Sequence, residues 1–349
     1  MINSQESQDI IYYIRKELHL KTISRLRIFF LFLFILGLLS GAADGESVTP
    51  LPPESPPPYK ADRPTAAPTE EPPDVVVDHV NRPDIMPKFF FPEGSKLLEI
   101  WIPNIKDADA ALLIYDGTTC MIDCGDERAA ARTVLLLKQL MIDKIDILFN
   151  SHLHHDHIDG LEATNAVAKI GKIKICFQPA LTASGLKMVE TAMWNRIPVS
   201  EYKDGDVFTM GEDGEVTLQF WKNNEKELDI NSQSALTKVT YGERSILFTA
   251  DVEKPGQEMI LKRLGPEALK SDILKYPHHG KTDMLTSFYN AVGARLVVVT
   301  SVAGRDDSGQ RFLKAREIPL VFTSLKGMFT HLVTDGHYWL CEYVPVTVE

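Results

Sequence analysis

Seven consecutive residues, Ser151 to His157, concentrate side chains that bind metal ions. The run Ser-His-Leu-His-His-Asp-His contains four of the ten histidines of the chain and one aspartate. Imidazole and carboxylate groups are the usual nitrogen and oxygen ligands of zinc, and they seldom crowd together without an ion. A lone histidine is more often structural, but four within seven residues favour a metal site.

The spacing within this cluster predicts two adjacent metal sites. His152 and His154 lie two residues apart just after a predicted strand, so in an extended backbone they point the same way and can bind one ion. Asp156 and His157 follow where the chain turns into a helix, and they point to a different side. Two ions about 3.5 to 4 Å apart suit hydrolysis by a bridging hydroxide. We expect His155 to be exposed or to support the ligands.

Three further segments place candidate ligands at predicted strand ends, and they contain Asp123, Asp251 and the pair His278 and His279. Each also has an ordinary structural explanation. Asp123 could cap a helix that begins near Glu127, Asp251 could be a simple strand-end carboxylate, and the histidine pair could form a solvated turn. The order of aspartate, histidine cluster, aspartate and histidine pair favours one shared site.

This order resembles that of the metallo-β-lactamase superfamily. The run 152–157 looks like its HxHxDH signature, and residues 96–343 follow its order of motifs. Asp123 resembles an early aspartate that supports the ligands, and Asp251 resembles a later aspartate that bridges both metals. The sequence Pro-His-His-Gly at 277–280 resembles the last histidine motif, in the form typical of the branch that includes the exported domain of the competence DNA-uptake channel ComEC.

The resemblance implies two divalent ions as cofactors, zinc or alternatively manganese. The implied ligands are His152, His154, Asp156, His157, Asp251 and His278, with His279 sharing that role or orienting substrate. For catalysis we expect Asp156, Asp123 and Lys281 to take part.

One departure from the family pattern concerns the first metal. No histidine lies between His157 and His278, so the usual third ligand of the pair His152 and His154 is missing. In its place the segment 231–234 resembles the Asn-x-x-Ser of the ComEC-like branch. This makes Asn231 and Ser234 candidate substitute ligands or substrate contacts. An amide oxygen is a weak, hard ligand compared with imidazole, so the first site is expected to bind its ion loosely or to prefer manganese.

Other departures concern residues next to the motifs. Asp159 and Ala250 stand where the family pattern has glycines, which puts the close backbone packing of both loops in question. Lys281 replaces the serine that often follows His-His-Gly. Its ammonium could hold a phosphate oxygen as a point charge, or it could simply be solvated.

Short apolar runs that alternate with amphipathic stretches predict the fold. Strands are expected at 97–102, 110–115, 119–123, 145–150, 172–177, 216–221, 236–241, 245–249, 272–276, 295–300, 320–323, 330–333 and 338–343, and helices at 127–140, 161–170, 181–194 and 255–264. Two halves of mixed strands flanked by helices suggest two packed sheets inside helical layers. With the family resemblance, this predicts a four-layer αββα sandwich.

The N-terminal part predicts delivery to a membrane. Basic residues at 1–27 precede an apolar stretch at 28–43, which predicts a cytoplasmic segment followed by a transmembrane anchor or signal peptide. Prolines dominate 44–92 and predict a disordered extended linker, which leaves 93–349 as the hydrolase domain. We expect a single-pass protein of the cell membrane with an extracellular C-terminal domain, or a secreted domain if the apolar stretch is cleaved.

The charge and the cysteine content limit which binding partners and which disulfides are expected. With 37 Lys and Arg against 48 Asp and Glu, the formal net charge is -11, which does not favour nucleic acid because polyanion binding needs clustered basic residues. The four cysteines form no paired motif and are expected to be buried, with one long-range disulfide left open. Oligomeric state is not predicted.

The expected function is metal-dependent hydrolysis, in which a metal-bound hydroxide attacks an ester-type electrophile. The ComEC-like resemblance implies phosphodiesterase or nuclease chemistry. Two alternatives stay open: hydrolysis of another substrate on the same fold, such as a cell-wall phosphodiester, a lactone or a β-lactam, or a non-catalytic surface module that keeps its metal for structure.

Overall fold

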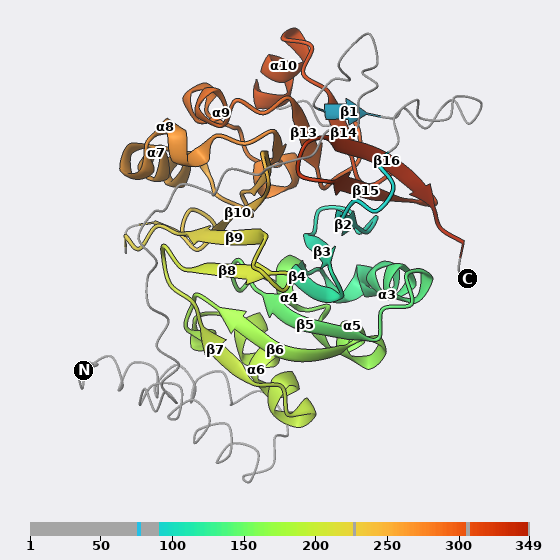
Figure 1. Ribbon diagram of the computed structural model, residues 1–349. Coiled ribbons are helices and arrows are strands. Elements are labelled where there is room, and N and C mark those ends of the chain that lie inside the picture. Colours follow the sequence, from blue (N-terminus) through green and yellow to red (C-terminus); the bar gives the residue numbers. More distant parts are fainter. Residues whose placement is uncertain (1–74, 78–90, 226–227, 305–307, 348–349) are drawn as a thin grey trace.

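The structure, a computed structural model, describes residues 75–77, 91–225, 228–304 and 308–347. Two β-sheets pack face to face inside helical layers, which is the αββα sandwich expected from the sequence (Figure 1). The segments predicted at 1–27 and 28–43, and most of the linker, lie outside the described residues. Within the described ranges, no helix is both long and apolar enough to cross a membrane.

The first sheet has nine strands in the order β1-β16-β15-β2-β3-β4-β5-β6-β7. Strands β4 to β7 run parallel to one another, whereas β15, β2, β3 and β4 pair antiparallel. The strands are β1 (Val75–Val77), β2 (Leu98–Ile102), β3 (Ala110–Tyr115), β4 (Thr118–Cys124), β5 (Lys144–Phe149), β6 (Lys169–Ile175), β7 (Val199–Glu201), β15 (Met328–Thr334) and β16 (Trp339–Pro345).

The second sheet has seven strands in the order β14-β13-β12-β11-β10-β9-β8. Strands β11 to β14 are parallel, and β8 to β11 pair antiparallel. The strands are β8 (Val207–Met210), β9 (Val216–Trp221), β10 (Leu236–Tyr241), β11 (Arg244–Phe248), β12 (Ile273–Lys275), β13 (Leu296–Val299) and β14 (Leu320–Phe322).

Helices form the outer layers, and Figure 1 shows α7 to α10 grouped apart from α3, α5 and α6. The helices are α3 (Ala130–Gln139), α4 (His155–Ile158), α5 (Leu161–Val167), α6 (Ala183–Asn195), α7 (Lys254–Leu264), α8 (Pro266–Leu269), α9 (Thr286–Val292) and α10 (Ser308–Ala315), with short 3-10 turns η1 (Glu127–Ala129), η2 (Pro179–Leu181) and η3 (Pro277–Gly280). One apolar core lies between the sheets, and two more lie under the helical layers. The four cysteines are free, and three of them are buried as expected.

Some predicted elements are wrong in detail. The helix predicted at 161–170 ends at Val167, because Lys169 and Ile170 pair with β5 as the start of β6. Strand β8 and helices α9 and α10 were not predicted. The last hairpin, β15 and β16, returns to the first sheet, where β15 pairs with β2, so the two sheets are not simply the two halves of the chain.

Gly160, which precedes α5, packs directly on the turn after β4. A Cβ at this position would lie 2.1 Å from the Cys124 carbonyl oxygen, whereas Asp159 has an ordinary helical φ of -71° and accommodates its side chain. We expect Gly160→Ala to lower the free energy of unfolding by about 2–3 kcal/mol through overpacking. Urea unfolding would measure it, with Asp159→Ala as the control at less than about 1 kcal/mol. Equal stability of both variants would contradict the prediction, because it would mean that the turn after β4 shifts to accommodate the added Cβ without cost.

His331 of β15 is buried between two carboxylates. Its ring stacks on Trp101 with centroids 3.9 Å apart, Nδ1 lies 2.9 Å from Glu342, and Nε2 lies 3.2 Å from Glu99. Burial alone would lower the pKa of His331, but the two carboxylates outweigh it and raise that pKa. A raised folded pKa means that this stabilisation is complete below the unfolded pKa of about 6.5 and is lost as pH rises through the folded value.

We therefore expect His331→Gln to cost about 2 kcal/mol of unfolding free energy in mildly acidic solution, the scale of hydrogen bonds to charged groups. The cost should shrink in alkaline solution, where the wild-type imidazole is neutral. Denaturant unfolding of both proteins at about pH 6 and about pH 9 measures the difference. A cost that does not change with pH would contradict a charged His331.

Candidate metal centre

The candidate aspartates and histidines lie at the ends of parallel strands, at one edge of the sandwich. Asp123 lies next to the last residue of β4, the histidine cluster follows β5, Asp251 follows β11, and the pair His278 and His279 follows β12. The carboxyl ends of parallel strands are where α/β folds place their sites, because several loops converge there. The structure brings these four segments together.

The turns after these strands hold unusual backbone conformations. Asp123, Ala250, His278 and His279 have φ of 58°, 45°, 49° and 52°, in the left-handed region that non-glycine residues rarely adopt. Such strain tends to be kept at functional sites. Ala250 keeps this conformation where the family pattern has glycine, so that departure does not open the turn.

His152 and His154 converge as their spacing predicts. Nε2 of His152 lies 3.1 Å from Nδ1 of His154, and the other nitrogen of His152 lies 3.1 Å from the Ser151 hydroxyl. Burial lowers the pKa of His152 well below its ordinary value and also lowers that of His154. A lowered pKa favours the neutral imidazole, which is the form that binds metal.

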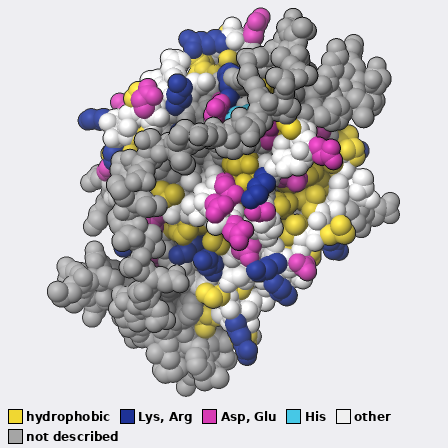
Figure 2. Space-filling view, viewed as in Figure 1, with side chains coloured by type: hydrophobic (Ala, Val, Ile, Leu, Met, Phe, Trp, Pro, Cys, Tyr) yellow, Lys and Arg dark blue, Asp and Glu magenta, His cyan; other side chains and the backbone are white. Residues whose placement is uncertain are grey.

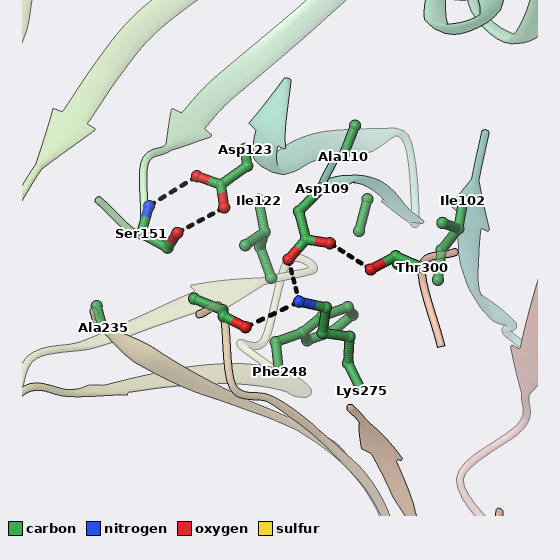
Figure 3. Close-up of a pocket in the computed structure, with 12 residues that line it drawn as sticks. Ile102, Asp109, Ala110, Ile122, Asp123, Ser151, Ala235, Phe248, Lys275 and Thr300 are labelled. Atoms are coloured by element: carbon green, nitrogen blue, oxygen red, sulfur yellow. Dashed lines mark hydrogen bonds and ion pairs between the residues drawn. The ribbon is translucent and has the colours of Figure 1, made fainter. Parts of the chain in front are cut away.

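Asp123 contacts the ring nitrogen of His157 that does not face Asp251. Its carboxylate accepts the Ser151 N–H at 2.7 Å and the Ser151 hydroxyl at 2.6 Å (Figure 3). It also lies 2.7 Å from Nδ1 of His157. Burial raises the pKa of Asp123. The cap of η1 is Asp126, whose side chain accepts the Arg128 N–H, so the reading of Asp123 as a helix cap is wrong. Asp123 has the supporting place that the resemblance implied.

The two histidines of η3 face different partners. Nε2 of His279 lies 3.5 Å from Asp156 and 3.4 Å from Oδ1 of Asp251. Nε2 of His278 lies 3.6 Å from Oδ2 of Asp251, and its Nδ1 lies 3.3 Å from Glu253. Burial lowers the pKa of His278, whereas for His279 burial is outweighed by Asp251 and Asp109, and the pKa rises to about 9.

Asp251 lies at the centre of these side chains and is almost fully buried. Besides the contacts with the η3 histidines, its Oδ1 lies 3.2 Å from Nε2 of His157. Burial would raise the pKa of Asp251, but the charges of His279 and His157 outweigh it and hold that pKa well below its ordinary value. At His157, burial would lower the pKa, but the carboxylates of Asp251 and Asp123 outweigh it and raise that pKa well above its ordinary value.

Several buried polar atoms at this centre have no hydrogen-bond partner. They are both carboxylate oxygens of Asp251 and the Nε2 atoms of His157 and His279. Buried polar groups are normally paired, so an unpaired group of imidazole and carboxylate atoms fits divalent metal ions. Asp109, His157, Asp251 and His279 each offer a ligand atom, and these atoms lie within 4.8 Å of one another.

Asp109 and Lys275 belong to this centre and were not predicted. Asp109 accepts the Thr300 hydroxyl at 2.7 Å and forms an ion pair with Lys275 (Figure 3). It also lies 3.1 Å from Nδ1 of His279. With these contacts Asp109 supports His279 as Asp123 supports His157. The missed signal is a lysine within the apolar strand 272–276, since a buried charge requires a partner.

An open pocket of about 460 Å³ leads to the centre. Its walls include His154, Asp156, Asn231, Asp251, His278 and Lys281. The Lys281 ammonium lies 3.7 Å from Asp156. His155 lies at the rim with 61% of its side chain exposed, in agreement with the prediction. Ser234 is buried and is not part of the pocket wall, whereas Asn231 is.

Comparisons with known proteins agree with the residue pattern. Residues 106–292, more than half of the 349 residues, match the family model of the metallo-beta-lactamase superfamily. The competence protein ComA of Neisseria gonorrhoeae is 25% identical over 251 residues, covering 68% of this chain and 32% of ComA. This chain thus spans about a third of that relative's length.

Solved structures with partial similarity include a metallo-β-lactamase from Cronobacter sakazakii, 18% identical with a TM-score of 0.36 over 50% of this chain and 76% of that one. A variant of the β-hydroxylase CmlA is 14% identical with a TM-score of 0.43 over 70% of this chain and 54% of its own. A B3 metallo-β-lactamase with an active-site glutamic acid is 14% identical, with a TM-score of 0.41 over 63% and 87%.

Proposed function

Because the chain belongs to the metallo-β-lactamase superfamily, we propose that it is an extracytoplasmic metal-dependent hydrolase that cleaves phosphodiester bonds. The observation that carries this is Asp251, a buried carboxylate with both oxygens unpaired, set among histidines at the floor of an open pocket. A metal kept only for structure would be enclosed by protein ligands. The open pocket therefore favours an enzyme over a non-catalytic module.

Divalent ions held by the histidines, Asp156 and Asp251 would supply Lewis acidity, which lowers the pKa of water and neutralises charge on an oxyanion. The chain's own residues prepare that chemistry. Asp123 and Asp109 fix the rings of His157 and His279, so that both Nε2 atoms face Asp251. The pocket wall then positions the ester next to these atoms.

Lys281 favours a phosphodiester among the ester-type substrates. Its ammonium is partly exposed in the pocket wall, 3.7 Å from Asp156, where it can reach a phosphate oxygen as a point charge. The ComEC-like motif form supports the same choice.

The charge of the chain favours a small phosphodiester over a long nucleic acid. In Figure 2, the Lys and Arg side chains of the visible described surface lie in small groups among acidic and hydrophobic ones, not as one broad basic face. Polyanion binding needs such a face. A small lactone or β-lactam is the second candidate that this charge allows. Hydrolysis of a lactone or β-lactam, with no phosphodiester cleaved, would select it.

We expect Asp156→Ala to lower kcat/KM for bis-p-nitrophenyl phosphate by about 10³-fold, because it removes a carboxylate whose Oδ2 lies 3.5 Å from His279. Release of p-nitrophenol with zinc or manganese present measures the loss. The control is His337→Ala, which changes an exposed histidine of the turn between β15 and β16 and should keep wild-type activity. Full activity of Asp156→Ala would refute the mechanism, provided circular dichroism shows an unchanged fold.

For the location, we propose a single-pass anchor at 28–43 with the domain outside the cell, on the basis of the basic residues before this apolar stretch. Extracellular protease added to intact cells should then remove the domain, while residues 1–27 stay protected. Protection of the domain would contradict this topology, and its recovery from the medium would indicate cleavage and secretion.

A further inference from the structure

We infer that His278 takes the place of the missing third histidine ligand of the first metal, and that Glu253 and Asn231 position it. This rests on the metal binding of the proposed function. It assigns one histidine of the Pro-His-His-Gly motif to each of two half-sites. The first half-site comprises His152, His154, His278 and Oδ2 of Asp251; the second comprises Asp156, His157, His279 and Oδ1 of Asp251.

The two oxygens of Asp251 divide the histidines between them. Oδ2 lies 3.8 Å from Nε2 of His152 and 3.6 Å from Nε2 of His278. Oδ1 lies 3.2 Å from Nε2 of His157 and 3.4 Å from Nε2 of His279. His278 is therefore grouped with the histidine that lacks a third partner, not with His157.

The backbone of η3 explains how adjacent histidines serve different half-sites. His278 and His279 both have left-handed φ, and their rings lie 6.0 Å apart with an interplanar angle of 70°. Asp156 lies 3.5 Å from Nε2 of His279, which places His279 in the second half-site. The separation of the rings leaves His278 free to face the first.

Carboxylates also orient the rings in the same way. Nδ1 of His278 lies 3.3 Å from Glu253, as Nδ1 of His157 lies 2.7 Å from Asp123 and Nδ1 of His279 lies 3.1 Å from Asp109. A carboxylate on one nitrogen of an imidazole fixes its tautomer and directs the other nitrogen to the metal. All three histidines thus present Nε2 to Asp251. The contact of His278 with Glu253 is the longest of the three, and Nδ1 of His278 makes no hydrogen bond in this structure.

Asn231 acts behind this ligand. Its side-chain N–H donates to Glu253 at 3.2 Å, so the amide holds the carboxylate that holds His278. The Asn231 side chain also lies beside His154, in the wall of the same pocket. Asn231 therefore supports the first half-site through Glu253, while its Oδ1 is buried with no hydrogen-bond partner.

The test counts ions in the full-length chain after dialysis against excess Zn²⁺, by mass spectrometry of the metal, with Co²⁺ absorption as a second readout of the ligand set. Wild type should hold two ions, and His278→Ala and His154→Ala one each. Variants in one half-site are not additive, so His154→Ala with His278→Ala should still hold one ion, whereas His154→Ala with His279→Ala should hold none. His337→Ala, which changes an exposed histidine of the turn between β15 and β16, is the control that keeps two.

Glu253→Gln and Asn231→Ala should hold both ions but weaken the first by about 10- to 100-fold. His278→Asp keeps a metal ligand at this position. If His278→Ala loses the ion of the first half-site because a ligand is missing, and not because the protein misfolds, His278→Asp should bind two ions again. Two ions in His278→Ala with unchanged affinity, or none in the His154→Ala and His278→Ala double variant, would overturn the assignment while leaving the hydrolase proposal intact. A wild-type chain that binds no ion would overturn both.

Discussion

Replacement of Asp251 by asparagine is expected to lower kcat/KM for phosphodiester hydrolysis by about 10³-fold or more and to remove at least one of two bound ions. Both oxygens of Asp251 are buried without a hydrogen-bond donor, and each faces a different pair of histidines. An amide keeps one oxygen but turns an N–H group toward the other pair. Losing a bridging charge of this kind costs about 4 kcal/mol of transition-state stabilisation, which is about 10³-fold in rate.

The measurement combines kinetics with ion counting on the same protein sample. Asp159→Asn is the matched control, because Asp159 lies two residues after the motif and its carboxylate lies 3.5 Å from Lys187. It should keep both ions and wild-type kinetics. If Asp251→Asn retained two ions and near-normal kcat/KM, Asp251 could not be the residue on which both half-sites depend.

How much of this centre was predictable depends on how local each signal is. His152, His154, Asp156 and His157 form one short run, so their residue types and spacing suffice to predict a metal site. Asp123 could be found only through the family resemblance, because a strand-end aspartate also fits a helix cap. The structure decides between these readings through the contact of Asp123 with His157.

Supporting residues were missed because tertiary packing, not spacing, brings them together. Asp109 precedes β3 and meets Thr300 after β13, a separation of 191 residues. Glu253 lies two residues after Asp251, yet only the turn of η3 brings His278 to it. Local periodicity carries no information about such contacts, in the same way that it cannot tell which sheet receives β15.

The missing histidine shows that the motif alone does not reveal every side chain near the first metal site. The absence of a histidine between His157 and His278 predicted a first site that binds its ion loosely or prefers manganese, with Asn231 and Ser234 as substitute ligands or substrate contacts. In the structure the Asn231 side-chain N–H donates to Glu253, whose carboxylate lies 3.3 Å from Nδ1 of His278. The ligand count of a site is a property of the fold, so a motif with two adjacent histidines can supply two half-sites.

Lys275→Met is expected to be the most destabilising single change, lowering the free energy of unfolding by about 3–5 kcal/mol, as loss of one partner of a buried ion pair does. The Lys275 side chain is 2% exposed; its ammonium pairs with Asp109, donates to the Ala250 carbonyl at 2.8 Å, and lies 3.9 Å from Asp251. Its removal leaves two buried carboxylates without this cation. Urea unfolding of the metal-free protein measures the cost.

A second substitution separates lost charge from lost packing. Asp109→Asn in the Lys275→Met background removes the stranded charge but keeps the Thr300 hydroxyl within reach, so it should recover a large part of the loss. Lys238→Met is the matched control, because this partly exposed lysine of the same sheet also donates to a backbone carbonyl, that of Ala268 at 3.1 Å; it should cost less than about 1 kcal/mol. If Lys275→Met cost no more than Lys238→Met, Lys275 would be dispensable to the fold. The carboxylates would then be balanced by protonated His157 and His279 alone, whose pKa values are raised.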